Sequence, residues 1–269
     1  MKIKKLEHLS EVYSEYDAFL IDLWGVMHNG IKINSSAMNA VDKLEKKGKK
    51  ITFLSNAPRP AKKVAEFLRK LNMEEKFLKN IMTSGEAAIN SLKENKFGET
   101  FYHLGPQRDN SLFLNIKINK TTLDRCDFIL CTGLFDEEQD LDYYKKLLKN
   151  FTSKKLICTN PDLIVHYGNE QEYCAGKIAE IFENLGGKVI YFGKPHKEVY
   201  LSCLSPKQKT LVIGDNLNTD IRGANNMNLD SIFITGGIHK TKNNNEKEIF
   251  NMLRKNNVFA NFFQNELTW

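Results

Sequence analysis

Long apolar runs are missing from this sequence of 269 residues, and no window reaches the length that a membrane-spanning helix needs. The first twenty residues carry basic side chains but no apolar stretch as long as that of a signal peptide. We therefore expect a cytoplasmic protein that has no membrane partner.

Paired cysteines are also missing. The five cysteines are an odd number without a CxxC pair, so the sequence indicates neither a disulfide framework nor a zinc site. We expect buried free thiols, since unpaired cysteine behaves as a small apolar residue. The five are Cys126, Cys131, Cys158, Cys174 and Cys203.

A nucleic-acid recognition motif does not accompany the net charge of +6. The lysines are spread over helix-like segments such as DKLEKKGKK, where acidic residues lie between them. This pattern favours a solvated basic surface that is compatible with anionic small molecules, and we expect no nucleic-acid partner.

Strand-like and helix-like segments alternate along the chain. The apolar runs of strand length are AFLI (18–21), ITFL (51–54), TFYHL (100–104), DFILC (127–131), KLIC (155–158), KVIYF (188–192), TLVIG (210–214) and SIFIT (231–235). Segments with apolar residues three and four apart lie between them, for example at 37–48, 61–72, 142–151 and 174–187. The alternation predicts an α/β fold whose parallel sheet is covered by helices on both faces.

Polar side chains follow four of these runs. Asp22 follows the first, Ser55 and Asn56 the second, Lys194 the run at 188–192, and Asp215 the run at 210–214. Alone, the aspartates, the serine and the asparagine are typical of turns or helix caps, and a lysine is typical of the surface. Together they indicate one site, because ligands of open α/β sheets bind beyond the carboxyl ends of the strands.

The chemistry of this set suits metal-assisted phosphoryl transfer. A phosphate ester repels an anionic nucleophile unless a cation and hydrogen-bond donors offset its charge. Mg²⁺ prefers oxygen ligands, which Asp22 and Asp215 could supply. Ser55, Asn56 and Lys194 could then hold the transferring oxygens.

At these residues the sequence resembles the haloacid dehalogenase superfamily of phosphatases. The order DxxGV, apolar residues followed by SN, a lysine, and GDxxxxD is similar to the four motifs of that family. The resemblance narrows to the class IIA branch, the 4-nitrophenyl phosphatase and nucleotide monophosphatase type. It rests on SNAPRP (55–60), TSGEAA (83–88), CTNPD (158–162), CAGKIAE (174–180) and YFGKPH (191–196).

The resemblance implies a role for each matching residue. Asp22 is similar to the nucleophile that forms an aspartyl-phosphate and binds Mg²⁺, and Lys194 to the lysine that steadies nucleophile and phosphate. Ser55 and Asn56 are similar to the phosphate-binding turn.

The same resemblance implies the metal ligands. Asp215 is similar to the metal-binding acid, and the residue at position 24 contributes its backbone carbonyl to Mg²⁺. Asp220 is similar to the last acid of the fourth motif, which either binds the metal through water or orients Lys194.

An inserted domain is expected between Ser55 and Lys194. The resemblance implies a doubly wound, Rossmann-like core formed by residues 1–79 and 190–269, with a C2-type α/β cap at 80–189 that selects the substrate. We expect Asn160 and Asp162 to bind substrate and Tyr173 to affect its choice. A homodimer formed through the cap stays open.

The sequence departs from the family pattern at Trp24. In most of the family this residue is a second aspartate, which protonates the leaving group and activates the hydrolytic water. An indole N–H is a donor only and does not titrate near neutral pH. The ring is either a packing residue or a flat wall for a substrate ring. His28 is either a substitute acid–base group or a structural histidine.

The leading hypothesis is a Mg²⁺-dependent phosphatase or phosphotransferase acting on a small phosphorylated metabolite, of the sugar phosphate or nucleotide monophosphate type. The alternative is a phosphate-binding or regulatory protein with little turnover, because Trp24 stands where the general acid is expected.

Overall fold

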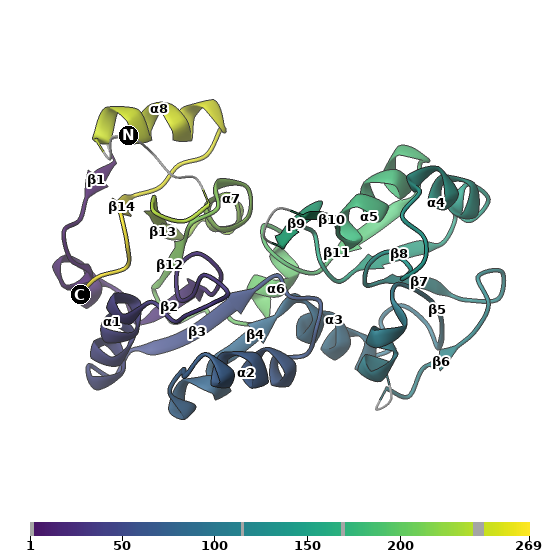
Figure 1. The fold of residues 1–269 in the computed structure, drawn as a ribbon, viewed down its shortest axis with the longest axis horizontal. Helices are drawn as coiled ribbons and strands as arrows, with labels where there is room; N and C mark the ends of the chain where they lie inside the picture. Colours follow the sequence, from purple (N-terminus) through teal and green to yellow (C-terminus); the bar gives the residue numbers. More distant parts are fainter. Residues whose placement is uncertain (1–2, 114–115, 168–169, 239–244) are drawn as a thin grey trace. The chain divides into compact units, whose positions relative to one another are not determined.

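The computed structural model describes residues 3–113, 116–167, 170–238 and 245–269 (Figure 1). Within these ranges no helix combines the length and the apolar character that crossing a membrane requires. The chain divides into two compact units. The first unit comprises Met1–Ser55, Val64–Met82 and Lys194–Trp269, and the second comprises Asn56–Lys63 and Thr83–Gly193. The domain boundaries expected from the sequence stay a prediction.

The first unit is built on a seven-stranded sheet. In spatial order its strands are β1 (Lys4–Lys5), β14 (Phe262–Gln264), β13 (Asp230–Ile234), β12 (Thr210–Gly214), β2 (Ala18–Asp22), β3 (Lys50–Ser55) and β4 (Ile81–Thr83). From β1 through to β3, each neighbouring pair is parallel. The central strands β2 and β12 are buried along their whole length, which explains their continuous apolar sequences.

Helices and helical turns complete this unit. They are η1 (Leu9–Glu11), η2 (Tyr13–Glu15), α1 (Ser35–Lys46), α2 (Ala61–Lys70), η3 (Glu75–Asn80), α6 (Lys197–Leu201), the π-helical turn η5 (Leu217–Ile221), α7 (Arg222–Asn226) and α8 (Glu246–Lys255). The residues of α1 that are buried, such as Ala37, Val41 and Leu44, recur three and four apart, as the amphipathic pattern predicts. The first turn of α2 is assigned to the second unit.

The second unit has its own parallel sheet. The spatial order is β11 (Lys188–Tyr191), β8 (Lys155–Cys158), β7 (Phe128–Cys131), β5 (Thr100–Leu104) and β6 (Asn119–Lys120), and every neighbouring pair is parallel. Its helices are α3 (Ser84–Lys93), η4 (Gln107–Phe113), α4 (Leu141–Leu148) and α5 (Ala175–Asn184). An antiparallel hairpin, β9 (Ile164–Tyr167) and β10 (Glu170–Tyr173), leads into α5.

The predicted α/β fold is confirmed, and all eight apolar runs form strands within a residue or two of the expected bounds. The short edge strands and the hairpin were not predicted. One spatial expectation is wrong: β11, the strand before Lys194, belongs to the second sheet, so the polar residues do not all follow strands of one sheet. The buried cysteines carry no disulfide, and Cys203 is only half-buried.

Candidate functional site

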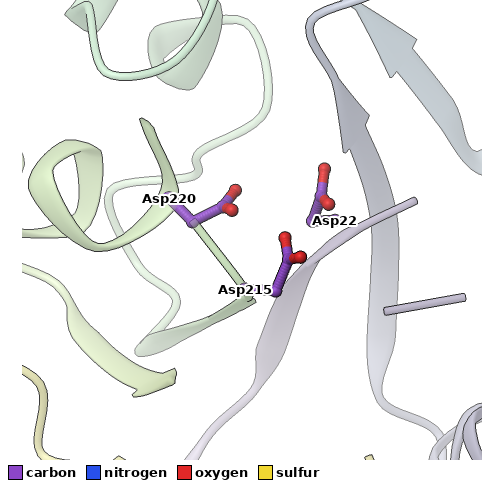
Figure 2. Close-up of side chains that lie close together, drawn as sticks. All are labelled: Asp22, Asp215 and Asp220. Atoms are coloured by element: carbon purple, nitrogen blue, oxygen red, sulfur yellow. The ribbon is translucent and has the colours of Figure 1, made fainter. Parts of the chain in front are cut away.

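Three carboxyl groups of the first unit converge beyond the carboxyl ends of two paired strands. Asp22 ends β2, and Asp215 directly follows β12, its neighbour in the sheet. Asp220 comes from η5, the turn after Asp215. One oxygen of each lies within 4.8 Å of the others, and all three residues are buried (Figure 2). We call Asp22, Asp215 and Asp220 the acidic triad.

Lys194 is the cation that the structure places in this cluster. It opens the last segment of the first unit and is 3% exposed. Its Nζ donates to Oδ1 of Asp22 and, at 2.7 Å, to Oδ1 of Asp220. One ammonium group therefore bridges two carboxylates. Three carboxylates and one ammonium leave the cluster two negative charges in excess when all are ionised.

The excess negative charge appears in the pKa values. Burial raises the pKa of Asp22 well above its ordinary value, the charges of Asp220 and Asp215 raise it further, and Lys194 opposes the shift. Burial and the Asp220 charge raise the pKa of Asp215 to about 7. Burial alone lowers the pKa of Lys194, but Asp22 and Asp220 outweigh it and raise that pKa. The triad therefore favours the binding of a positively charged species.

Two glycines make room for Asp215. A Cβ atom on Gly25 or on Gly237 would come within 2.0 Å of Asp215 Oδ2, which no real side chain tolerates. Gly25 also has φ of +89°, in the left-handed region. The backbone N–H of Ile238 donates to the same Oδ2 at 2.7 Å. The loops at Gly25 and Gly237 therefore fix the position of this carboxylate.

Asp220 is held at both oxygens. Its Oδ1 accepts from Lys194, and its Oδ2 accepts from the backbone N–H of Asn216 at 3.1 Å. Asn216 in turn caps η5, because its Oδ1 accepts from the N–H of Asn218 at 2.9 Å. Of the two roles that the family resemblance implies for Asp220, this geometry favours orientation of Lys194.

The loop after Asp22 presents Trp24 and buries His28. Trp24 is 52% exposed, so it is not a core packing residue. His28 is 5% exposed, and the N–H of Gly30 donates to its Nδ1 at 3.0 Å. Burial lowers the pKa of His28 to about 4. A neutral imidazole with one nitrogen already accepting a hydrogen bond fits the structural role for His28 and argues against the acid–base role.

The remaining predicted residues fall into two groups. Ser55 ends β3 in the first unit, next to Leu54, which pairs with Asp22. Asn56, Asn160 and Asp162 cluster within the second unit. Asn56 Nδ2 donates to Asp162 Oδ1 at 3.0 Å, and the Asp162 N–H donates to Asn160 Oδ1 at 3.0 Å.

Several residues that shape the site were given no role from the sequence, although Gly25 stands in the DxxGV motif and Asn216 in GDxxxxD. Gly25 and Gly237 set the position of Asp215, and the Ile238 and Asn216 N–H groups bind triad oxygens. The double glycine directly after the strand at 231–235 was an available signal, because a glycine after a buried strand often marks close approach of backbone and ligand.

The donor set of the triad fits a divalent cation. Carboxylate and carbonyl oxygens are the hard ligands that Mg²⁺ and Ca²⁺ take, and the triad gathers carboxylates with excess negative charge. Burial keeps this charge away from bulk water. A bound cation would therefore relieve the repulsion among the carboxylates.

Comparison with known proteins decides the family. A family model for haloacid dehalogenase-like hydrolases matches residues 19–119, and a HAD-hydrolase-like model matches residues 191–259. A solved hydrolase of the haloacid dehalogenase-like family from Brucella suis 1330 is 31% identical, over 87% of this chain and 90% of that one, with a TM-score of 0.77. The chain belongs to the haloacid dehalogenase-like hydrolase family.

Two further relatives of this haloacid dehalogenase-like protein are phosphatases by name. The p-nitrophenyl phosphatase from Archaeoglobus fulgidus shares the fold, with a TM-score of 0.78 and 19% identity over 93% of this chain and 96% of that chain. The acid sugar phosphatase of Staphylococcus aureus strain MRSA252 is 24% identical over 246 residues, which cover 87% of this chain and 92% of the relative. These matches confirm the predicted class of enzyme, a phosphoric monoester hydrolase, and hydrolases of this family use a divalent metal ion.

Proposed function

We propose that this chain is a Mg²⁺-dependent phosphatase or phosphotransferase that acts on a small phosphorylated metabolite through an aspartyl-phosphate at Asp22. The observation that carries the proposal is the buried Asp22 carboxylate, which Lys194 holds beside Asp215 and Asp220. A carboxylate in this setting is held in a fixed position, and a cation bound at the triad would offset its repulsion of a phosphate ester.

The reaction has two steps at Asp22. A carboxylate oxygen attacks the phosphorus, the ester P–O bond breaks, and the leaving oxygen takes up a proton from solvent water. Water then attacks the phosphorus of the acyl phosphate, the bond to Asp22 breaks, and inorganic phosphate leaves. If an alcohol replaces water in the second step, the same residues carry out phosphotransfer.

Lys194 has the task of orienting the nucleophile. Its hydrogen bond fixes one oxygen of Asp22, and its charge offsets part of the repulsion between carboxylate and phosphate. Asp220 anchors Lys194 from the other side. Removal of either group is therefore expected to affect the placement of Asp22.

Asp22, Asp215 and the backbone carbonyl of Trp24 would hold the cation, and Asp220 would contribute through water or through Lys194. Bound there, Mg²⁺ supplies Lewis-acid stabilisation of the charge on the phosphate oxygens. The oxygen-only donor set supports this choice over a zinc ion, which takes nitrogen and sulfur ligands more often.

Ser55 and Asn56 would donate to the transferring phosphate, and Asn160 and Asp162 would contact the rest of the substrate. The hydrogen bonds that link Asn56, Asp162 and Asn160 support a shared role for these positions. The acid sugar phosphatase among the relatives supports a sugar phosphate, and the p-nitrophenyl phosphatase is consistent with a wider range of monoesters.

The alternative is a phosphate-binding or regulatory protein with little turnover. Trp24 favours it, because no titratable group stands at the position where the family pattern has its acid. The loss of a general acid is worth about 10²- to 10⁴-fold in rate. The retained Asp22 argues against it, since a binding protein has no need of a nucleophile.

The test is a panel of phosphate monoesters, with good and poor leaving groups, assayed with and without Mg²⁺. Wild-type protein is expected to release phosphate only with the cation, and Asp22→Asn is expected to lose this activity. Asp230→Asn is the matched control, because Asp230 is a carboxylate of the same unit whose bonds to Tyr16 and Asn261 are structural. Tight phosphate binding without turnover in the wild type would favour the alternative.

A further inference from the structure

Tyr200 carries a buried hydroxyl in the same segment of the first unit as Lys194. It lies in α6, six residues after Lys194, and its side chain is fully buried. Among the residues that the structure describes, none forms a hydrogen bond with this hydroxyl. A buried polar group without a partner costs stability, and a phenylalanine would fill the same space without that cost. The hydroxyl therefore needs an explanation other than packing.

Gly223 shows where the hydroxyl lies relative to Asp220. A Cβ atom on Gly223 would lie 2.1 Å from Tyr200 Oη, so the hydroxyl occupies the place of a side chain on α7. Asp220 stands three residues before Gly223, in the continuous helical segment formed by η5 and α7. Residues three apart on a helix are neighbours, with about 5 to 6 Å between their Cβ atoms. This separation is too long for a direct hydrogen bond and suits one bridging water molecule.

The charges that act on this hydroxyl are those of Asp220 and Lys194. Burial raises the pKa of Tyr200, the charge of Asp220 raises it further, and the charge of Lys194 opposes the shift. The hydroxyl therefore stays protonated and can donate. Asp220 accepts one bond from Lys194 and one from Asn216, and a carboxylate has about four acceptor sites. Asp220 can therefore accept a further bond.

The position of Lys194 depends on how firmly Asp220 is held. Lys194 Nζ donates to one oxygen of Asp22 and to one oxygen of Asp220, so a shift of Asp220 moves the ammonium group relative to the nucleophile. The Asp220 side chain packs against the backbone of Gly214, where a Cβ atom would lie 2.2 Å from Asp220 Cγ. A further hydrogen bond to this carboxylate would restrict Lys194 as well.

We propose that Tyr200 is a positioning residue that acts through Asp220. Its hydroxyl, linked by one enclosed water molecule to the Asp220 carboxylate, holds this acid in the orientation that fixes Lys194 against Asp22. The inference deepens the proposed function, and its kinetic consequence rests on that function. Because Tyr200 is fully buried and touches no substrate, its hydroxyl affects the rate of the chemical step and not the binding of substrate.

The kinetic test removes the hydroxyl alone. Tyr200→Phe is expected to lower kcat for 4-nitrophenyl phosphate by about two- to tenfold, the contribution of one hydrogen bond, and to leave KM unchanged. Tyr16→Phe is the matched control, because Tyr16 is a buried tyrosine of the same unit whose hydroxyl donates to Asp230 at 2.8 Å. The control should lower the midpoint of urea unfolding and leave kcat and KM unchanged. An unchanged kcat in Tyr200→Phe, or equal falls in both variants, would overturn the proposal.

A stability measurement tests the link to Asp220 without any turnover. Urea midpoints are compared for the wild type, Tyr200→Phe, Asp220→Asn and the double variant, all without divalent cations. A hydrogen bond to a carboxylate is stronger than one to an amide. Loss of the hydroxyl should therefore lower the midpoint more, or raise it less, in the wild type than in the Asp220→Asn background. Additive shifts would show that the hydroxyl and the carboxylate do not interact, and would overturn the proposal.

The two failures then differ. Absence of turnover with every monoester, together with non-additive midpoints, would reject the proposed function and keep the link between Tyr200 and Asp220. Turnover of 4-nitrophenyl phosphate with the same kcat in wild type and Tyr200→Phe would keep the function and reject the positioning role. Additive midpoints reject the link whether or not the protein turns over a substrate.

Discussion

The charge state of the acidic triad is the central feature at the scale of single residues. Three buried carboxyl groups lie together, one lysine bonds to two of them, and burial adds to the cost of their mutual repulsion. Such an arrangement costs stability in the metal-free protein and is relieved by a cation. Function and stability therefore make opposite demands on these residues.

Replacement of Asp215 by Asn should make the metal-free protein more stable. The substitution removes one of the repelling charges while the amide oxygen can still accept from Ile238. We expect the free energy of unfolding at pH 8 without divalent cations to rise by about 1 to 3 kcal/mol, within the range of a buried charge imbalance. Urea titrations measure it. Mg²⁺ should stabilise the wild type and not the variant, and equal stabilisation of both would contradict this account.

His103, in the second unit, makes the stability of the protein depend on pH. It is buried in the second unit between Thr132, at 2.9 Å, and Asn110, at 3.2 Å. Burial first, and then the charge of Lys120, lower its pKa to about 4 from an ordinary 6.5. The unfolded chain thus binds the extra proton between these values, so stability falls as the pH drops from 6.5 to 4 and levels off below.

His103→Asn should remove part of this acid sensitivity. The wild type is expected to lose more free energy of unfolding between pH 6.5 and 4.5 than the variant does, by about 1 to 3 kcal/mol at roughly 1.4 kcal/mol for each pKa unit. His28 contributes a similar slope in both proteins. Parallel stability curves for the two proteins would show that His103 is not buried in its neutral form.

At the scale of elements, loops rather than strands define the site. The loop after β2 brings Gly25 against Asp215, and the loop after β13 brings Gly237 and the Ile238 N–H to the same carboxylate. Neither contact could be predicted from the sequence, because each depends on tertiary approach to Asp215, from Gly25 190 residues before it and from Ile238 23 residues after it. The strands themselves were predictable, since β2, β3, β12 and β13 are buried apolar runs.

Gly25→Ala should lower activity more than the strain of an alanine in left-handed backbone alone explains. Gly48 is the matched control, because it also has positive φ, at +71°, but no atom lies within 4 Å of where its Cβ would be. Both alanine variants are expected to lose about 1 kcal/mol of stability from the left-handed backbone. Only Gly25→Ala should also lower metal-dependent activity, by displacing Asp215. Equal activity of the two variants would mean that this contact does not position the carboxylate.

At the scale of the whole molecule, the sequence predicts which residues form the site. It does not predict which sheet each neighbouring strand joins. The motifs pointed to Asp22, Lys194, Asp215 and Asp220, and the structure gathers these four in one unit. The sequence predicts that the run at 188–192 lies in the same sheet as the strands before these residues, yet this run forms β11 of the second sheet. An apolar run specifies a buried strand but not which of two sheets it joins, because both sheets bury the same kind of surface.

The second unit is predicted to choose the substrate. Tyr173 ends the hairpin β9–β10 and is 40% exposed, so Tyr173→Ala should change the free energy of unfolding by no more than about 0.5 kcal/mol. It should alter the ratio of kcat/KM between sugar phosphates and nucleotide monophosphates. Tyr143→Ala in α4 of the same unit removes an equally exposed ring and should leave that ratio unchanged. If both variants shift the ratio alike, the hairpin has no special role in selection.

The most direct test of the central claim is chemical trapping of the intermediate on Asp22. Protein mixed with Mg²⁺ and 4-nitrophenyl phosphate is quenched during turnover and treated with borohydride, which reduces an acyl phosphate to an alcohol. Mass spectrometry of the peptide that contains Asp22 should then show homoserine at this position, only when substrate is present and not in Asp22→Asn. Turnover that proceeds while Asp22 stays unmodified, or a trapped group on another residue, would contradict the account.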